Sequence, residues 1–166
     1  DSVIILIATE LLKYIIIYMA YKGRYKIKNP DKYLGNSSNV VFRSLWERNA
    51  FRWCENNPKV RAWSSEEIVV PYKCSVDRKL HRYFVDLYLE MTNGSVYLIE
   101  IKPKKETIPP KQGKRKTKRY INEVLTFSKN QDKWEAADQY AKHKGWQFQV
   151  WTEETLNNLG IKVLNT

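Results

Sequence analysis

Two stretches in the middle of the chain alternate between apolar and polar residues as β-strands do. They are HRYFVDLYLE and SVYLIEI, residues 81–90 and 95–101, and both are rich in aromatic and β-branched side chains. This pattern predicts an antiparallel hairpin. Asp86, Glu100 and Lys102 interrupt the apolar pattern, and charged residues within apolar strands are usually paired or bound to a metal ion. We therefore take these three residues as the first candidates for a functional site.

The register of this hairpin decides whether the two acids can meet. A two-residue turn at 93–94 would place Asp86 opposite Ile101, so that Asp86 and Glu100 would face opposite sides of the sheet. A three-residue loop at 92–94, with its glycine in a left-handed bulge, would place Asp86 opposite Glu100 instead. A shared metal site therefore requires the longer loop.

The rest of the chain predicts a series of helices and strands around this hairpin. In order, they are a helix at 40–55, a strand at 66–72, helices at 119–128 and 130–144, a strand at 146–151 and a short terminal helix. Ser37 or Ser38 can cap the first helix, Gly145 can end the third, and Thr152 can cap the last. This order predicts a mixed α/β sheet flanked by helices in a single domain.

The N-terminal residues differ in character from the rest. Residues 1–18 are strongly apolar, but Asp1, Glu10 and Lys13 interrupt them, no basic region precedes them, and they are short for a membrane span. Because Met19 opens an ordinary basic sequence, we interpret residues 1–18 as an extension upstream of the native start. If they are native, we expect an apolar helix packed on the core or on a partner, without membrane insertion.

The chain has 166 residues, which is enough for one domain with a sizeable core. We expect a basic extended arm at 19–39 and the domain itself at 40–166. The net charge of +11 and the pI of about 9.6 indicate a polyanionic partner, although charge alone does not separate nucleic acid from an anionic membrane surface. Cys54 and Cys74 lack a CxxC spacing, which favours reduced thiols and argues against a zinc site.

Much of the charge lies in the segment that follows Lys102. Residues 103–119 hold eight basic residues and one glutamate, which supply +7 of the net +11. A charge run is most often a solvated loop, but the overall charge favours contacts with DNA phosphates beside the candidate site. Nothing in the segment indicates readout of bases, so weak sequence preference is expected. The expected DNA-binding residues are Lys104, Lys105, Lys111, Lys114, Arg115, Lys116, Lys118 and Arg119.

Hydrolysis of a phosphodiester by a metal enzyme needs a hard cation held by oxygen ligands and a positioned water. Asp86, Glu100 and the carbonyl of Ile101 could supply the ligands for Mg2+ or Mn2+. Lys102 lies two residues after Glu100 in the same strand, so both point to one face, where the lysine could orient the water or offset charge on the phosphate. The structural alternative is an ordinary salt bridge between Glu100 and Lys102 on an exposed sheet edge, which would stabilise little.

The order Asp86…Glu100-Ile101-Lys102 resembles the signature of the PD-(D/E)xK nuclease superfamily, with Val85 in place of the proline before the aspartate. Within that superfamily, the sequence SLWERNAFRWCE resembles the helix that carries an additional active-site glutamate in the TnsA-like transposon endonucleases. That resemblance implies a catalytic role for Glu47, as a ligand or in the outer shell. Spacing alone leaves another interpretation open, in which Arg43 and Glu47 form an ordinary pair on the helix surface.

Several ordered blocks resemble the head completion nucleases of T-even-type tailed phages. The blocks are YKGRYKIKNPDKYLGN, VFRSLWE, EEIVVPY, HRYFVD, LIEIKPKK and WQFQVWTEETL, and the resemblance covers roughly Tyr21 to Ile161. The resemblance implies a restriction-endonuclease-like α/β fold and a metal-dependent DNA endonuclease acting on double-stranded DNA, with phage portal or head completion proteins as further partners. It also implies a location in the host cytoplasm during phage assembly or in the head–neck region of the virion. The alternative is a structural protein that uses the fold to bind DNA or the portal without catalysis.

Overall fold

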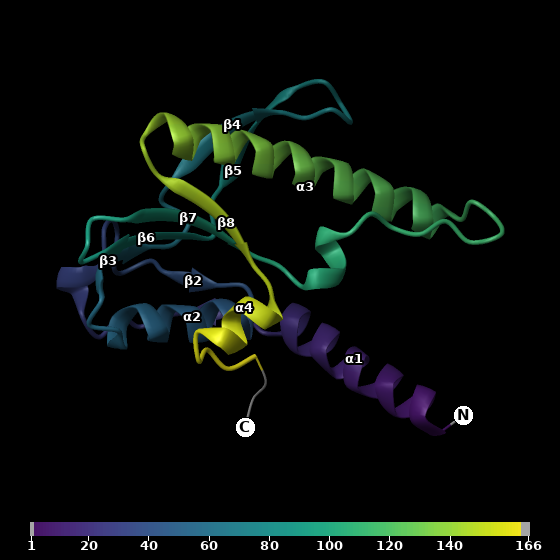
Figure 1. Ribbon diagram of the computed structural model, residues 1–166, viewed down its shortest axis with the longest axis horizontal. Helices are drawn as coiled ribbons and strands as arrows, with labels where there is room; N and C mark the ends of the chain where they lie inside the picture. Colours follow the sequence, from purple (N-terminus) through teal and green to yellow (C-terminus); the bar gives the residue numbers. More distant parts are fainter. Residues whose placement is uncertain (1, 164–166) are drawn as a thin grey trace.

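A four-stranded mixed β-sheet forms the centre of the protein (Figure 1). The computed structural model describes residues 2–163. The strand order is β3-β6-β7-β8, and only β7 and β8 run parallel. The strands are β3 (Val60–Ser64), β6 (Leu87–Met91), β7 (Val96–Ile101) and β8 (Gln147–Trp151).

Helices cover both faces of this sheet and create a hydrophobic core on each side. Helix α2 (Leu45–Asn56) and the short α4 (Glu153–Asn158) lie on one face, and α3 (Lys118–His143) crosses the other (Figure 1). Leu87, Leu89 and Ile99 pack into the core on the α2 side, while Leu98 packs with α3 on the other side. The predicted α/β sheet flanked by helices is confirmed.

Smaller elements surround the sheet. Strands β4 (Val69–Lys73) and β5 (Leu80–Phe84) form a separate two-stranded hairpin that contacts α3. Strands β1 (Gly23–Arg24) and β2 (Val41–Phe42) pair antiparallel. Two short 3-10 helices, η1 (Pro30–Lys32) and η2 (Lys104–Thr107), precede β2 and follow β7, respectively.

The strand predicted at 81–90 is two strands rather than one. Strand β5 ends at Phe84 and pairs with β4, whereas β6 begins at Leu87 and joins the central sheet. The chain changes sheets at Val85-Asp86, and because both halves keep the same alternating pattern, periodicity alone does not reveal the break. Strand β3 was not predicted, and the strand predicted at 66–72 begins later, at Val69.

The helices also differ from the prediction in their bounds. Helix α2 begins at Leu45 and is capped by Ser44, rather than by Ser37 or Ser38, because Val41 and Phe42 are held in β2. The two helices predicted at 119–128 and 130–144 form the single helix α3, since no glycine or proline interrupts that stretch.

Two predicted helix boundaries near the C-terminus are confirmed, the end of one helix at Gly145 and the start of the next at Thr152. Gly145 adopts a φ of +72° just after α3, as a helix-terminating glycine does. The side chain of Thr152 takes part in a capping box with Thr155 at the start of α4.

The predicted three-residue loop at 92–94 is confirmed. Met91 N–H donates to the Ser95 carbonyl oxygen at 2.8 Å, and Gly94 adopts a φ of +87°. Leu87 pairs with Ile99, which places Asp86 at the level of Glu100 on the neighbouring strand.

The segment predicted as a basic arm packs against the domain. Tyr33 is buried in the core, and the Lys32 ammonium donates to the carbonyls that end α2, namely those of Cys54, Glu55 and Asn57. The Glu55 carboxylate accepts hydrogen bonds from the backbone N–H groups of Lys28 and Asn29. These contacts hold the segment against the C-terminal end of α2.

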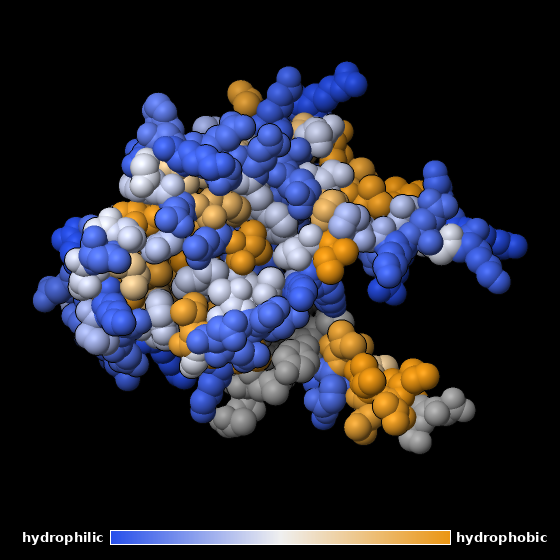
Figure 2. All heavy atoms as spheres, in the orientation of Figure 1, coloured by the Kyte–Doolittle hydropathy of each residue, from blue (hydrophilic) through white to orange (hydrophobic). Residues whose placement is uncertain are grey.

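Helix α1 (Ser2–Ala20) projects from the body of the protein (Figure 1), and Figure 2 shows hydrophobic side chains on its outer part. Residues 3–13 are exposed. Across residues 2–163, no helix combines the length and the apolar character needed to cross a membrane.

Candidate active site

Glu100 is buried at the end of the central strand β7. Its side chain retains 6% exposure, and the Tyr83 hydroxyl in β5 donates a hydrogen bond to Glu100 Oε2. Because β7 lies between β6 and β8, Glu100 is not on a sheet edge. The salt bridge between Glu100 and Lys102 that the structural alternative describes does form, but on a buried central strand and not on an exposed edge.

Asp86 lies where the chain passes from β5 to β6, next to Glu100. Asp86 Oδ2 accepts a hydrogen bond from Ile101 N–H at 2.8 Å, which fixes the carboxylate against the end of β7. Burial, followed by the charges of Glu100 and Glu47, raises the pKa of Asp86 well above its ordinary value. The ionised form of Asp86 is therefore disfavoured in this site, and a bound cation would stabilise it.

Lys102 completes the group on the same face as Glu100. Its Nζ lies 3.6 Å from Glu100 Oε1 and 4.0 Å from Glu106 Oε2. Burial acts to lower the pKa of Lys102, but the charges of Glu100, Asp86 and Glu106 outweigh it and raise the pKa above its ordinary value. Lys102 therefore stays protonated at neutral pH and can stabilise anionic charge, but it cannot act as a general base there.

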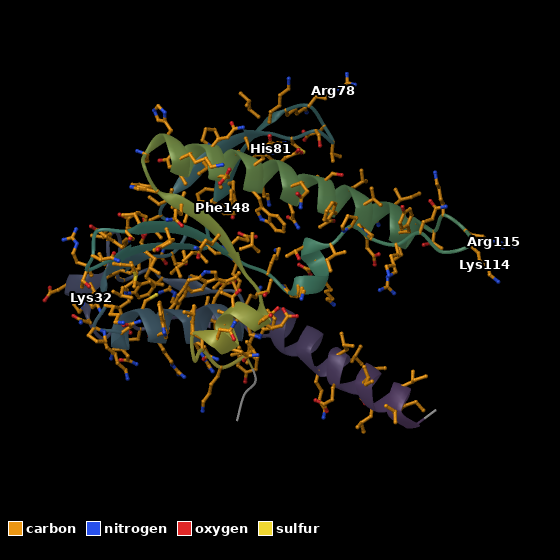
Figure 3. The ribbon with its side chains drawn as sticks, in the orientation of Figure 1. Lys32, Arg78, His81, Lys114, Arg115 and Phe148 are labelled. Atoms are coloured by element: carbon orange, nitrogen blue, oxygen red, sulfur yellow. The ribbon has the colours of Figure 1, made fainter. Side chains whose placement is uncertain are left out.

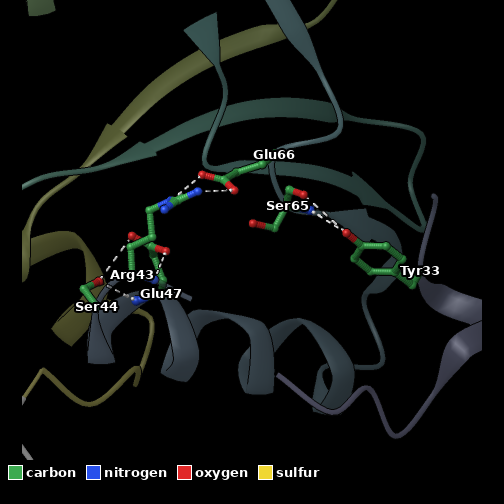
Figure 4. Close-up of polar contacts among 6 residues, drawn as sticks. All are labelled: Tyr33, Arg43, Ser44, Glu47, Ser65 and Glu66. Atoms are coloured by element: carbon green, nitrogen blue, oxygen red, sulfur yellow. Dashed lines mark hydrogen bonds and ion pairs between the residues drawn. The ribbon is translucent and has the colours of Figure 1, made fainter. Parts of the chain in front are cut away.

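Glu47 approaches the same region from the first turn of α2. Its Oε2 accepts a hydrogen bond from Arg43 N–H at 2.8 Å, and its own N–H donates to Ser44 Oγ at 3.2 Å (Figure 4). The carboxylate thus helps to begin the helix. Burial raises the pKa of Glu47 to about 7, with the charges of Glu66 and Glu100 adding to it and the bond from Arg43 opposing it.

The proposed surface pair between the side chains of Arg43 and Glu47 does not form. The Arg43 guanidinium instead forms a bidentate salt bridge with Glu66, with Nε–Oε1 at 2.8 Å and Nη2–Oε2 at 3.2 Å (Figure 4). The Glu47 carboxylate is bonded to Arg43 N–H and Ser44 Oγ and lies within electrostatic reach of Glu66 and Glu100.

Glu47, Asp86 and Glu100 together form an acidic cluster in which each carboxylate is buried or half-buried. Oxygen ligands of this kind suit Mg2+ or Mn2+, which retain several waters and so need only two or three protein ligands. Across residues 2–163, the group whose three ligand atoms all lie within 4.8 Å of one another is Cys74, Asp77 and His81. The carboxylates of the acidic cluster are more widely spread, which fits a hydrated ion rather than an ion enclosed by protein.

A cavity of about 690 Å³ lies between η2 and the first half of α3. Glu106, which contacts Lys102, forms part of its wall. Its lining combines cations, carboxylates, apolar side chains and other polar groups: Lys105, Glu106, Ile108, Pro110, Lys118, Arg119, Asn122, Glu123, Thr126, Phe127 and Asn130. Arg119 is paired with Glu123 across 2.8 Å, which leaves Lys105 and Lys118 as the other cations of the lining.

The expected DNA-binding residues fall into two groups. Lys105, Lys118 and Arg119 line the cavity, whereas the exposed residues 111–116 form a tip that projects from the body, where Figure 3 labels Lys114 and Arg115. The Lys104 ammonium instead lies 3.4 Å from Glu154 Oε2, and the backbone N–H of Lys104 donates to Glu153 at 2.8 Å. The segment therefore places three of its basic residues in the wall of the cavity and four on the projecting tip.

Tyr83 and Glu106 lie near the cluster and were not predicted from the sequence. Tyr83 reaches it from β5, and Glu106 reaches it from η2. No local pattern marks either residue, because each contributes through tertiary contact. The capping sequence Ser44-x-x-Glu47 was a usable signal for the true start of α2.

Comparison with known proteins identifies the family. A family model described as "TnsA-like endonuclease N terminal" matches residues 57–153. The chain belongs to the TnsA-like endonuclease family. The match contains Asp86, Glu100 and Lys102, whereas Glu47 lies before it. The resemblance drawn from sequence motifs is confirmed.

This TnsA-like protein also has a close phage relative. It is 43% identical over 148 residues to the head completion nuclease of Enterobacteria phage T4. The alignment covers 87% of this chain and 99% of that protein, so the two are related over most of their lengths.

Proposed function

We propose that this protein is a divalent-metal-dependent DNA endonuclease that acts in phage head completion after DNA packaging. The observation that carries the proposal is the register of β6 and β7, which sets Asp86 beside Glu100 with Lys102 on the same face. The raised pKa values of Asp86 and Glu47 support it, since they reflect carboxylates that are buried first of all and, in addition, placed near other acids.

In this mechanism, Asp86, Glu100 and the Ile101 carbonyl would hold Mg2+ or Mn2+, which would activate a water for attack on the phosphodiester. Protonated Lys102 would stabilise charge that develops on the phosphate. Tyr83 would orient Glu100 through its hydrogen bond. Glu47 would act as an outer acid, linked through water.

Double-stranded DNA is the proposed substrate, bound by phosphate contacts and with little sequence preference. Lys105, Lys118 and Arg119 would hold the strand next to the acidic cluster, and the tip at 111–116 would contact phosphates further along. The likeness to the phage T4 head completion nuclease supports action during phage assembly in the host, at packaged DNA ends or at the head–neck junction. Portal or other head completion proteins would be partners there.

Nicking of supercoiled plasmid tests the proposal. The parent should nick DNA with Mg2+ or Mn2+ and not with a chelator, while Asp86→Asn and Glu100→Gln should be inactive. Lys102→Ala should lose about 100- to 1,000-fold in rate, the usual size of a lost charge-stabilising group. Glu135→Gln on the exposed face of α3 is the matched control and should retain activity. Equal nicking rates of the parent and Asp86→Asn would refute the assignment of Asp86 to the active site.

A second candidate is a structural protein that binds DNA or the portal at the head–neck junction without cleaving. The projecting basic tip favours it, because DNA binding there does not need the acidic cluster. DNA affinity that depends on the tip, together with an absence of metal-dependent nicking, would select this function.

A further inference from the structure

The β4–β5 hairpin holds a second group of ligand-type side chains, apart from the acidic cluster. Cys74 follows β4, Asp77 lies in the turn, and His81 is in β5. One ligand atom from each side chain lies within 4.8 Å of the other two. Cys74 is buried, and the other two are exposed, so the group sits at the protein surface with one side open to solvent.

The turn is built in a way that brings these side chains together. Arg78 has a φ of +60°, a left-handed conformation uncommon in a residue other than glycine. Its N–H donates to the Cys74 carbonyl at 2.8 Å, and Cys74 N–H donates to the Lys79 carbonyl at 2.9 Å. Such backbone strain costs about 1–3 kcal/mol, and it persists only where surrounding contacts impose it.

Neighbouring contacts orient two of the three candidate ligands, Asp77 and His81. Asp77 Oδ1 accepts from Lys79 N–H at 3.0 Å, and Asp77 Oδ2 lies 2.7 Å from His81 Nε2. The His81 ring stacks on Tyr72, its partner across the hairpin, with centroids 5.7 Å apart. These contacts fix two ligand side chains that would otherwise move freely at the surface.

The turn is also attached to helix α3. Asp132 Oδ2 accepts hydrogen bonds from both the N–H and the Oγ of Ser75, each at 2.7 Å. The position of Cys74 relative to the rest of the group is therefore set by the body of the protein as well as by the hairpin. Figure 3 shows the location of His81 and Arg78 in this hairpin, well separated from the basic tip.

We propose that Cys74, Asp77 and His81 form a binding site for a Zn2+-class transition-metal ion that ties the β4–β5 hairpin together. Thiolate, imidazole and carboxylate are the ligand types that Zn2+ takes, and a fourth position open to solvent would hold water. Mg2+ and Ca2+ prefer sites made of oxygen alone, so this site and the acidic cluster would select different ions. The spacing Cys-x2-Asp-x3-His explains why a search for CxxC pairs does not find it.

The bound ion would stabilise the β4–β5 hairpin and would not take part in catalysis. Strand β5 carries Tyr83, which contacts Glu100, and leads directly into Asp86. Holding the hairpin tip would therefore steady the part of the chain that enters the acidic cluster. The proposal does not depend on nuclease activity, because it rests on ligands outside that cluster.

Co2+ titration of the metal-free full-length protein tests the site. A thiolate-to-metal charge-transfer band should appear at one ion per chain and should disappear when Zn2+ is added in competition. The acidic cluster contains no thiol, so an ion bound there cannot produce this band. Each of Cys74→Ala, Asp77→Asn and His81→Ala should weaken Co2+ binding more than about tenfold, a loss that even outer partners of metal ligands can cause.

The chain provides matched controls, since it has two cysteines and two histidines. Cys54→Ala and His143→Ala should keep the band and the affinity. His81→Ala and Asp77→Asn alter exposed side chains, so they keep the test decisive if Cys74→Ala does not fold. Zn2+ should raise the Tm of the parent and of His143→Ala by similar amounts, and raise that of His81→Ala by less.

Two results would overturn the site. One is a parent protein that shows no charge-transfer band at equimolar Co2+. The other is Zn2+ or Co2+ binding that is equally strong in the parent and in His81→Ala, which would place the ion elsewhere on the chain.

Discussion

Replacing Glu47 with glutamine should stabilise the metal-free protein and make it respond less to metal. The side chain of glutamine keeps an oxygen that can accept the hydrogen bond from Arg43 N–H, so the start of α2 should survive. What the substitution removes is a carboxylate whose pKa is raised, chiefly by burial, from 4.5 to about 7. Folding therefore opposes the ionised form of Glu47.

The size and sign of this effect follow from linkage between protonation and folding. Below pH 4.5 the carboxyl is protonated in both states and costs nothing; as the pH rises through about 7, the folded state must accept an unfavourable charge. A pKa raised from 4.5 to about 7 corresponds to about 3 kcal/mol at pH values above both. Metal-free parent protein should lose up to that much stability, relative to Glu47→Gln, between about pH 4.5 and pH 7.

Urea unfolding with a chelator at pH 5 and pH 8 measures this difference, and the same experiment with Mg2+ tests its origin. A bound ion stabilises the folded state by about 2.7 kcal/mol at 100 times its Kd. The parent should gain more from Mg2+ at pH 8 than Glu47→Gln does, because an additional carboxylate favours the cation. The stability advantage of the variant should therefore shrink or reverse when metal is present.

Glu135→Gln, an exposed substitution on α3, controls for the loss of one negative charge and should follow the parent at both pH values. Parallel stability curves for the parent and Glu47→Gln between pH 5 and pH 8 would refute the argument. They would mean that Glu47 is hydrated and does not share in the repulsion of the acidic cluster.

Three further predictions follow from other contacts. Tyr83→Phe removes the hydroxyl that donates to Glu100 and should lower single-turnover nicking about tenfold with unchanged far-UV circular dichroism; an unaltered rate would show that Glu100 needs no such orientation. Gly94→Ala should cost about 1–2 kcal/mol in urea unfolding, because the added methyl has open space but the φ of +87° disfavours it, and Gly113→Ala is the control expected near zero. Replacing the basic tip by alanine should reduce the slope of log K against log salt for DNA binding by about 3–4, and an equal slope would remove the tip from the interface. The residues to be replaced there are Lys111, Lys114, Arg115 and Lys116.

The sequence by itself determined features that depend on neighbouring residues. It marked residues 92–94 as the turn of the hairpin but allowed two registers, and only the structure fixed the three-residue loop that places Asp86 beside Glu100. Gly145 and Thr152 mark helix ends, since turns and caps are decided by backbone conformations and hydrogen bonds a few residues apart. The alternation of β7 likewise placed Glu100 and Lys102 on one face.

Only the tertiary structure decided which distant residues meet. The break between β5 and β6 at Asp86, the approach of Tyr83 to Glu100, and the arrival of Glu47 from α2 all depend on packing between separate elements. The group of Cys74, Asp77 and His81 is of the same kind, because it needs the left-handed turn and its attachment to α3. Alternation and helical spacing describe which face a residue occupies, but not what that face packs against.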